Sequence, residues 1–219
     1  MLVAKGIEKY YGDLHVLKGV DVMISQGEVV SIVGASGAGK STLLHILGTL
    51  DEADKGEVKV GETNVTKLKG DKLAEFRNRE IGFIFQFHNL LPEFTGEENI
   101  IIPGLIAGRN EKELKTRAKE LATILGVEGR LQHKPSELSG GEQQRIAVAR
   151  ALINDPKIIF ADEPSGNLDS KSAQDLHELF FRLRDEFGQS FVIVTHNQEL
   201  AEMADRMLTM QDGKIVSGL

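Results

Sequence analysis

Four short apolar runs, rich in β-branched and aromatic residues, recur along the chain with helix-forming stretches between them. Runs without polar alternation are typical of strands buried on both faces, as in a parallel sheet. Helices must cover both faces of such a sheet, so the pattern predicts an α/β fold. In open parallel sheets, ligands bind at the carboxyl ends of the strands. The four runs are Glu28–Gly34, Ile81–Gln86, Lys157–Glu163 and Ser190–His196.

Two amphipathic helices are predicted between these runs. The first follows Asn110, whose side chain suits an N-cap, and should stop at Gly126. The second runs from Ser172 and should end at Gly188. The apolar face of the first helix is spaced as a single stripe, made of Leu114, Ala118, Leu121, Ala122 and Leu125.

The chain has 219 residues, a formal net charge of −7 and no cysteine. The length suits one large domain or one domain carrying an insertion. The acidic balance argues against a mainly electrostatic nucleic-acid binder, and the lack of cysteine fits a reducing compartment. The N-terminal stretch is charged throughout and has no apolar core of signal-peptide length. No window approaches the roughly 20 apolar residues of a membrane span, so we expect a cytosolic chain or one held at a membrane by a partner.

The sequence GASGAGKS, Gly34 to Ser41, follows one predicted strand and opens a predicted helix. This is the context that the phosphate-binding P-loop requires. Backbone N–H groups of such a loop surround a β-phosphate, while Lys40 reaches the β- and γ-phosphates and the Ser41 hydroxyl binds Mg²⁺. A glycine-rich turn without a ligand is the alternative, and the strand–loop–helix context argues against it. The predicted nucleotide-binding residues are Gly34, Ala35, Ser36, Gly37, Ala38, Gly39, Lys40, Ser41 and Thr42.

Polar side chains close the other three predicted strands. Asp162 and Glu163 follow one apolar run, where the first carboxylate suits Mg²⁺ and the second suits a water molecule that attacks phosphorus. Alone, such a pair more often marks a solvated turn, but a P-loop in the same chain reverses those odds. In isolation His196 is best read as a partly buried histidine bonded to a carbonyl, and Gln86 is a weaker signal still.

A second candidate anion site lies a hundred residues after the P-loop. In LSGGEQQ, Ser139 stands at a helix N-cap position and Glu142 completes a capping-box pattern. Two glycines at the start of a helix leave backbone N–H groups open to an anion. The sequence therefore raises the question of why one chain carries two phosphate sites.

The order of these motifs resembles the ATP-binding-cassette (ABC) ATPase family along the whole chain, and LSGGE is that family's signature. The resemblance implies a P-loop ATPase core with a parallel sheet, an N-terminal antiparallel β subdomain and a helical insertion. It also implies one nucleotide-binding domain over residues 1–219, with the helical subdomain inserted at about 87–155. Two such subunits pair head to tail in this family when ATP is bound. Each ATP then lies between one chain's P-loop and the partner's signature, which answers the question of the second site.

The resemblance assigns ATP and Mg²⁺ as ligands and gives a role to each motif. Tyr11 matches the aromatic residue that stacks on adenine, Glu163 the catalytic glutamate and His196 the switch histidine on the γ-phosphate. Gln86 matches the glutamine that touches Mg²⁺ and the attacking water. The implied metal residues are Ser41, Gln86 and, through a water, Asp162; the implied signature acting in trans is Leu138, Ser139, Gly140, Gly141 and Glu142; and the implied dimer-crossing loop is Asn167, Leu168 and Asp169.

Longer stretches are similar to the ATPases of mechanotransmitting transporters, and most of all to those of lipoprotein-releasing transporters. The segment FHNLLP after Gln86 carries much of this resemblance. It implies two separate transmembrane permease subunits docking near Gln86–Phe94, and a place on the cytoplasmic face of the inner membrane through those partners. Macrolide-efflux and cell-division ATPases share many of the motifs and stay as alternatives. Departures from the usual pattern are Ser165 for Thr, Asn197 for Asp, and Gly96-Glu97 for an apolar pair.

Other classes of ABC protein fit less well. Chromosome-organising ATPases place a long coiled coil between these motifs, and only about 50 residues separate Gln86 from Ser139 here. Ribosome-acting cassettes carry two cassettes and a basic linker, so no nucleic-acid partner is expected. A module without turnover would be expected to lose Lys40 or Glu163, and both are present. Leu90, Leu91, Pro92 and Phe94 form an apolar cluster that either docks a partner or packs under the helical insertion.

Overall fold

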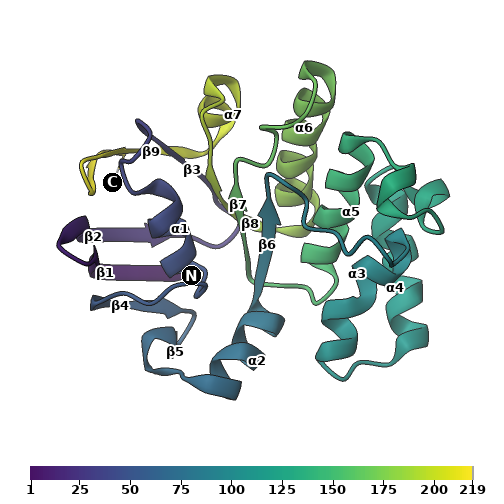
Figure 1. Ribbon diagram of the computed structural model, residues 1–219, viewed down its shortest axis with the longest axis horizontal. Helices are drawn as coiled ribbons and strands as arrows, with labels where there is room; N and C mark the ends of the chain where they lie inside the picture. Colours follow the sequence, from purple (N-terminus) through teal and green to yellow (C-terminus); the bar gives the residue numbers. More distant parts are fainter. Residues whose placement is uncertain (219) are drawn as a thin grey trace.

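A computed structural model describes residues 1–218 of the chain and places its strands in two sheets (Figure 1). The larger sheet has the order β10-β9-β3-β8-β7-β6, in which β3, β6, β7, β8 and β9 run parallel and β10 pairs antiparallel with β9. The four predicted runs are all strands of this sheet, each one or two residues shorter than predicted. Their bounds are β3 Val29–Val33, β6 Ile81–Phe85, β7 Ile158–Asp162, β8 Ser190–Val194, β9 Arg206–Gln211 and β10 Lys214–Ser217.

The smaller sheet is antiparallel and lies at the N-terminal side of the molecule, with the order β2-β1-β4-β5. It confirms the expected N-terminal antiparallel subdomain. Its bounds are β1 Leu2–Tyr11, β2 Leu14–Ile24, β4 Lys55–Val60 and β5 Thr63–Asn64.

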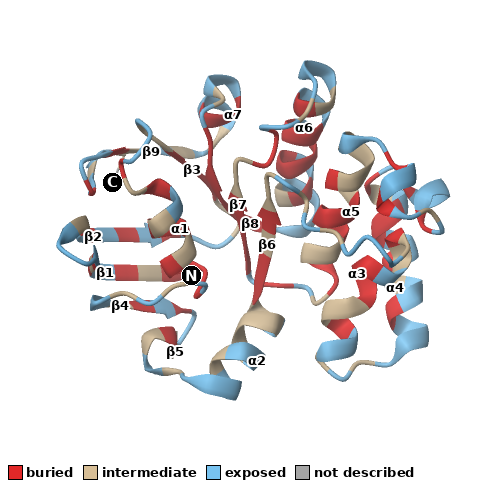
Figure 2. Cartoon of the chain, in the orientation of Figure 1, coloured by how far each residue is buried: buried red, intermediate tan, exposed pale blue. Residues whose placement is uncertain are grey.

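Successive residues of the central strands face two different cores, which explains why these strands are apolar without alternation. In β7, Ile158 and Phe160 belong to the core that holds α1 and the antiparallel sheet, whereas Ile159 and Ala161 belong to the core beneath α3 to α6. Burial on both faces is visible as red strands at the centre of Figure 2.

Seven α-helices and three short 3₁₀ turns join the strands within residues 1–218. Asn110 caps α4 as predicted, accepting from the N–H groups of Lys112 and Glu113. The helix α6 begins two residues earlier than predicted, because Asp169 caps it, and ends at Gly188 in the left-handed region. No helix among the described residues is long and apolar enough to cross a bilayer. The bounds are α1 Lys40–Leu47, η1 Val65–Lys67, α2 Gly70–Glu80, α3 Gly96–Ile106, α4 Glu111–Ile124, η2 Glu128–Arg130, η3 Pro135–Glu137, α5 Gly140–Leu152, α6 Ser170–Phe187 and α7 Gln198–Met203.

The helices α3, α4 and α5 pack together on one side of the parallel sheet (Figure 1). Their close approach uses Gly104 of α3, where a Cβ atom would lie 2.2 Å from the buried Leu114 side chain of α4. The helix α5 also packs on β6, so this group is continuous with the sheet. The range of about 87–155 for a helical insertion stays a prediction.

A charged capping network fixes the start of α5. The Ser139 hydroxyl accepts from the Glu142 N–H at 3.3 Å, and the Glu142 carboxylate accepts from the Ser139 N–H at 2.8 Å. The second Glu142 oxygen lies 2.6 Å from Nε of Arg130. The Arg130 guanidinium and the Ser139 N–H together lower the pKa of Glu142 from 4.5 to about 2.

We therefore expect Glu142→Gln to lower the free energy of unfolding by an amount that depends on pH. Glutamine keeps the capping geometry but loses the charge. Because the folded pKa lies below the unfolded one, the charge stabilises the protein above about pH 4.5, and this contribution fades as the pH falls toward about 2. Urea unfolding from about pH 7 to about pH 3 should show a difference between wild type and variant that is constant at high pH and shrinks below about pH 4.5. A difference that does not change with pH would contradict this account.

Candidate active site

The GASGAGKS segment joins the end of β3 to the start of α1, the strand–loop–helix arrangement that its motif predicts. Gly34 has φ of 149°, and a Cβ atom there would lie 2.1 Å from the Met210 carbonyl oxygen, so the close approach to β9 requires glycine. The Lys40 ammonium folds back over the loop and donates to the carbonyls of Gly34 at 2.9 Å and Ala35 at 3.1 Å. The buried cation is thus held at the mouth of the loop.

Ser41 and Asp162 come together from α1 and the end of β7. The Ser41 hydroxyl lies 3.1 Å from one Asp162 carboxylate oxygen, and Nε2 of His45 lies 3.6 Å from the other. Hydroxyl and carboxylate oxygens are the hard donors that Mg²⁺ prefers, and Mg²⁺ commonly takes one or two of them alongside substrate phosphates. No cluster of three His, Cys, Asp or Glu side chains suited to a metal occurs in residues 1–218. The donor pair fits a metal shared with a nucleotide.

Glu163 occupies a strained position next to this pair. Its φ is 47°, a value that non-glycine residues rarely adopt. Its N–H donates to the Val194 carbonyl at 2.9 Å, which ties it to the end of β8. The carboxylate accepts from the His196 N–H at 3.1 Å, and its other oxygen lies 3.2 Å from Nε2 of the same histidine. The His196 side chain is 57 % exposed and faces a carboxylate rather than a carbonyl.

Gln86 closes β6, and in this structure its side chain is engaged with the loop after Glu163. Its Nε2 donates to Asn167 Oδ1 at 3.0 Å, and Asn167 Nδ2 donates to the Gln86 carbonyl at 3.1 Å. Gly166 leaves room for this pairing, since a Cβ atom there would lie 2.9 Å from Gln86 Nε2. The amide is therefore paired with the predicted crossing loop and not with Ser41 or Asp162.

The rest of the predicted crossing loop is well ordered within the chain. Asp169 caps α6, accepting from the N–H groups of Lys171 and Ser172 at 3.1 Å and from the Ser172 hydroxyl at 2.6 Å. The bonds from Ser172 hold the pKa of Asp169 below its ordinary value. Leu168 packs against the core beneath the helices.

Tyr11 lies at the end of β1, half exposed. Its hydroxyl donates to Asp51 at 2.6 Å, and Thr42 of α1 interacts with the same hydroxyl. The bond to Asp51, with some burial, raises the pKa of Tyr11. The Lys9 ammonium lies 5.0 Å from the ring centroid. An exposed aromatic ring beside α1 is a suitable platform for a nucleobase.

The signature glycines lie away from the P-loop. Gly141 is close to the Ser172 hydroxyl, and Gly140 to the Leu168 side chain, so the start of α5 adjoins the start of α6. The helix α1 belongs to the core on one face of the parallel sheet and α5 to the core on the other (Figure 1). Each helix start thus presents its N–H groups from a different side of the sheet.

Three polar residues outside the predicted site, of which Asn99 and Gln144 are fully buried, hold the segment after Gln86. Asn99 is fully buried; its Oδ1 accepts from the Leu91 N–H at 2.8 Å, and its Nδ2 donates to the carbonyls of Leu91, Phe94 and Thr95. Arg150 donates to the carbonyls of His88 and Asn89, both of which have positive φ. Gln144 contacts His88. The signal available in the sequence was Asn99 itself, a polar residue directly before three consecutive isoleucines.

The apolar cluster in this segment divides between the two alternatives left open by the sequence. Leu90 packs against the core beneath the helices, whereas Leu91 and Phe94 are 43 % and 41 % exposed.

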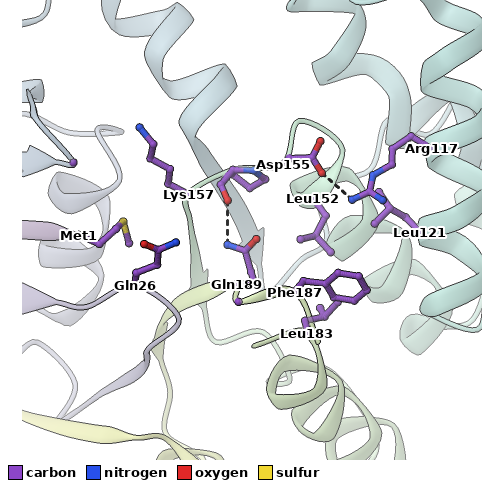
Figure 3. Close-up of a pocket in the computed structure, with 13 residues that line it drawn as sticks. Met1, Gln26, Arg117, Leu121, Leu152, Asp155, Lys157, Leu183, Phe187 and Gln189 are labelled. Atoms are coloured by element: carbon purple, nitrogen blue, oxygen red, sulfur yellow. Dashed lines mark hydrogen bonds and ion pairs between the residues drawn. The ribbon is translucent and has the colours of Figure 1, made fainter. Parts of the chain in front are cut away.

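A cavity of about 620 Å³ lies at the opposite ends of the strands from this site (Figure 3). It is lined by the residues before β7 and β8 and by the end of α6. Gln189 donates to the Pro156 carbonyl at 3.2 Å there, and Arg117 pairs with Asp155 at 2.7 Å. The cavity is therefore separate from Glu163, from the P-loop and from the strand ends that carry the candidate catalytic residues.

Comparison with known proteins agrees with this geometry. The family model described as ABC transporter matches residues 17–166. The chain is 60 % identical over 216 residues to the lipoprotein-releasing system ATP-binding protein LolD of Cytophaga hutchinsonii, covering 99 % of each chain. It is 58 % identical to the protein of that name from Bacteroides fragilis, covering 99 % of this chain and 100 % of that one.

Two solved structures of one protein are close in fold. The dimeric structure of MJ0796, a bacterial ABC transporter cassette, has a TM-score of 0.91 and 40 % identity, covering 99 % of this chain and 97 % of that one. A post-hydrolysis dimer of MJ0796 bound to ADP and Pi has a TM-score of 0.90 and 38 % identity, covering 100 % and 98 %. Matches of this length and identity lead to one conclusion: the chain belongs to the ABC transporter family.

Proposed function

We propose that this chain is an Mg²⁺-dependent ATPase that works as one of two identical nucleotide-binding subunits and drives separate transmembrane subunits. The observation that carries the proposal is the placement of α1 and α5, whose starts the motifs predict to bind phosphate, on different faces of one sheet. A single γ-phosphate contacts both only if they come from two chains. The relatives named for lipoprotein release support lipoproteins of the bacterial inner membrane as the cargo.

In the proposed site, ATP replaces the contacts that the chain now makes with itself. Lys40 exchanges the Gly34 and Ala35 carbonyls for the β- and γ-phosphates. Ser41 and Asp162 would hold the metal, which would supply positive charge to offset that of the phosphates. Tyr11 stacks on the adenine. Gln86 would exchange its bond to Asn167 for contacts with the metal and the attacking water.

Hydrolysis requires a positioned water and a base. Glu163 is set at the end of β7 by its bond to Val194 and orients the water that attacks the γ-phosphorus. As the new P–O bond forms, the bond to ADP breaks and the water proton passes to the carboxylate. The His196 ring, which lies beside the Glu163 carboxylate in this structure, contacts the γ-phosphate once ATP binds. In the paired state Ser139, Gly140 and Gly141 of the second chain add N–H donors and the positive end of a helix dipole.

The docking surface for the permease subunits is the groove beside the end of β6. A cavity of about 450 Å³ lies between α2, β6, α3 and α5. Asn89 of the segment Gln86–Phe94 and the 73 % exposed Ile106 line it, and the same segment carries the partly exposed Leu91 and Phe94. Through these partners the chain would sit on the cytoplasmic face of the inner membrane. The whole of residues 1–219 would then act as one cassette, with a helical insertion at about 87–155.

The experiment that tests the ATPase proposal is Glu163→Gln. The amide keeps the size of the carboxylate and removes the base, so turnover should fall by roughly 10²–10⁴-fold while ATP binding is retained. The trapped nucleotide should hold two chains together, seen as a shift from monomer to dimer on size exclusion with MgATP. The exposed Glu186→Gln serves as the matched control and should hydrolyse normally. A Glu163→Gln protein with wild-type turnover would remove this carboxylate from the mechanism.

The docking proposal predicts a different outcome for Leu91→Glu and Phe94→Glu. Both side chains are partly exposed, so the charges should leave folding and the ATPase rate of the isolated chain intact. Burying a charge at an interface should weaken permease binding by roughly tenfold or more. Leu14→Glu, at the more exposed start of β2, is the control. Co-purification with the permease pair measures the effect; a collapse in melting temperature would show instead that these residues pack inside the fold.

A further inference from the structure

Gln144 lies one turn into α5 and is fully buried. A buried amide must find partners for its oxygen and its N–H groups, because leaving them unpaired away from water destabilises the fold. Its sequence neighbours do not require it there, since the helix would form as well with an apolar residue. The partners of this side chain therefore explain its presence.

Those partners come from three separate segments. Gln144 Nε2 donates to the Pro164 carbonyl at 2.7 Å and, more weakly, to the Phe85 carbonyl at 3.4 Å. Its Oε1 accepts from Nδ1 of His88, a tautomer assigned from the donor on the amide side. Pro164 directly follows Glu163, Phe85 directly precedes Gln86, and His88 belongs to the segment Gln86–Phe94.

We infer that Gln144 is a positioning residue that links the signature helix, the loop after Glu163 and the segment Gln86–Phe94 within one chain. Its amide touches no reacting atom. Because the amide bonds to several segments at once, one segment cannot move without breaking bonds that Gln144 makes. The roles given to the three segments rest on the proposed function. In that function, a displacement of the segment Gln86–Phe94 at the permease interface also displaces the loop after Glu163 and the helix α5, which contacts the ATP bound to the partner chain. The link itself is a property of the isolated chain.

Nearby polar residues serve as comparisons, because each bonds to one region. Arg150 donates to the carbonyls of His88 and Asn89 in the segment after Gln86. Gln143, the residue before Gln144, donates to the carbonyls of Pro135 and Leu138 just ahead of its own helix. The bonds of Gln144, by contrast, run both to the segment after Gln86 and to the loop after Glu163.

The test perturbs one segment and reads another, in the full chain without nucleotide. His88→Gly suits the positive φ of this residue and removes its bond to Gln144. Residue-resolved hydrogen exchange is then read at Gly166 and Leu168, whose N–H groups bond to the carbonyls of Glu163 and Ser165. We expect their exchange to quicken by about fivefold, as expected for an ordinary hydrogen bond. His88→Asn, which also tolerates positive φ and places an amide atom near the position of Nδ1, should restore the slow exchange.

Gln144→Met completes the cycle. It should quicken exchange at Leu91 and at Leu168 together, and His88→Gly should add nothing at Leu168 in that background. Gln143→Met is the matched control and should change neither. The inference is overturned if His88→Gly changes only its own segment, or if its effect at Leu168 persists without Gln144. If Gln144→Met does not fold, the His88 variants alone decide. None of these measurements involves ATP, so they stand or fall separately from the ATPase proposal.

Discussion

Burial of the parallel sheet on both faces is the constraint on which the rest of the molecule depends. Residues 158 to 161 alternate between two cores, so the strand needs α1 and the antiparallel sheet on one side and α3 to α6 on the other. That requirement brings the carboxyl ends of β3, β6, β7 and β8 to one edge, where the P-loop, Gln86, Glu163 and His196 lie. It also places α1 and α5 in different cores, which is the arrangement from which a site shared between two chains is proposed.

Around this edge the polar groups satisfy one another. Lys40 bonds to carbonyls of its own loop, Ser41 to Asp162, Gln86 to Asn167, and Glu163 to His196. In the proposed function, these contacts within the chain are exchanged for contacts with a nucleotide. Part of the binding free energy is thereby used to exchange contacts between segments, which is how occupancy of a site changes the arrangement of the loops around it.

Local patterns in the sequence were sufficient for the strands and for the helix caps at Asn110 and Ser139, because both depend on residues close in the chain. The motif residues could also be assigned to one edge of the sheet, because each follows a predicted strand and the carboxyl ends of parallel strands lie at the same edge. Side-chain pairs between distant elements could not be predicted from the sequence, since each pair is set by how those elements pack. These pairs are Glu142 with Arg130, Gln86 with Asn167 and His88 with Gln144. The positive φ of Glu163 likewise depends on the bond to β8. The metal, adenine and crossing-loop roles of the site residues stay predictions.

The composite site is tested most directly by mixing two variants that are each defective. Lys40→Ala removes the cation of the P-loop, and Gly141→Asp places a carboxylate where the helix start should meet a phosphate. With Glu163→Gln added to both chains to prevent turnover, neither homodimer should trap ATP. The mixed dimer has one site with both defects and one intact site, so it should trap up to one ATP per dimer. In the control mixture, Gly129→Asp takes the place of Gly141→Asp, because a Cβ atom at Gly129 would meet no other atom within 4 Å. If heterodimers isolated through two tags trap no ATP, the shared-site account is wrong.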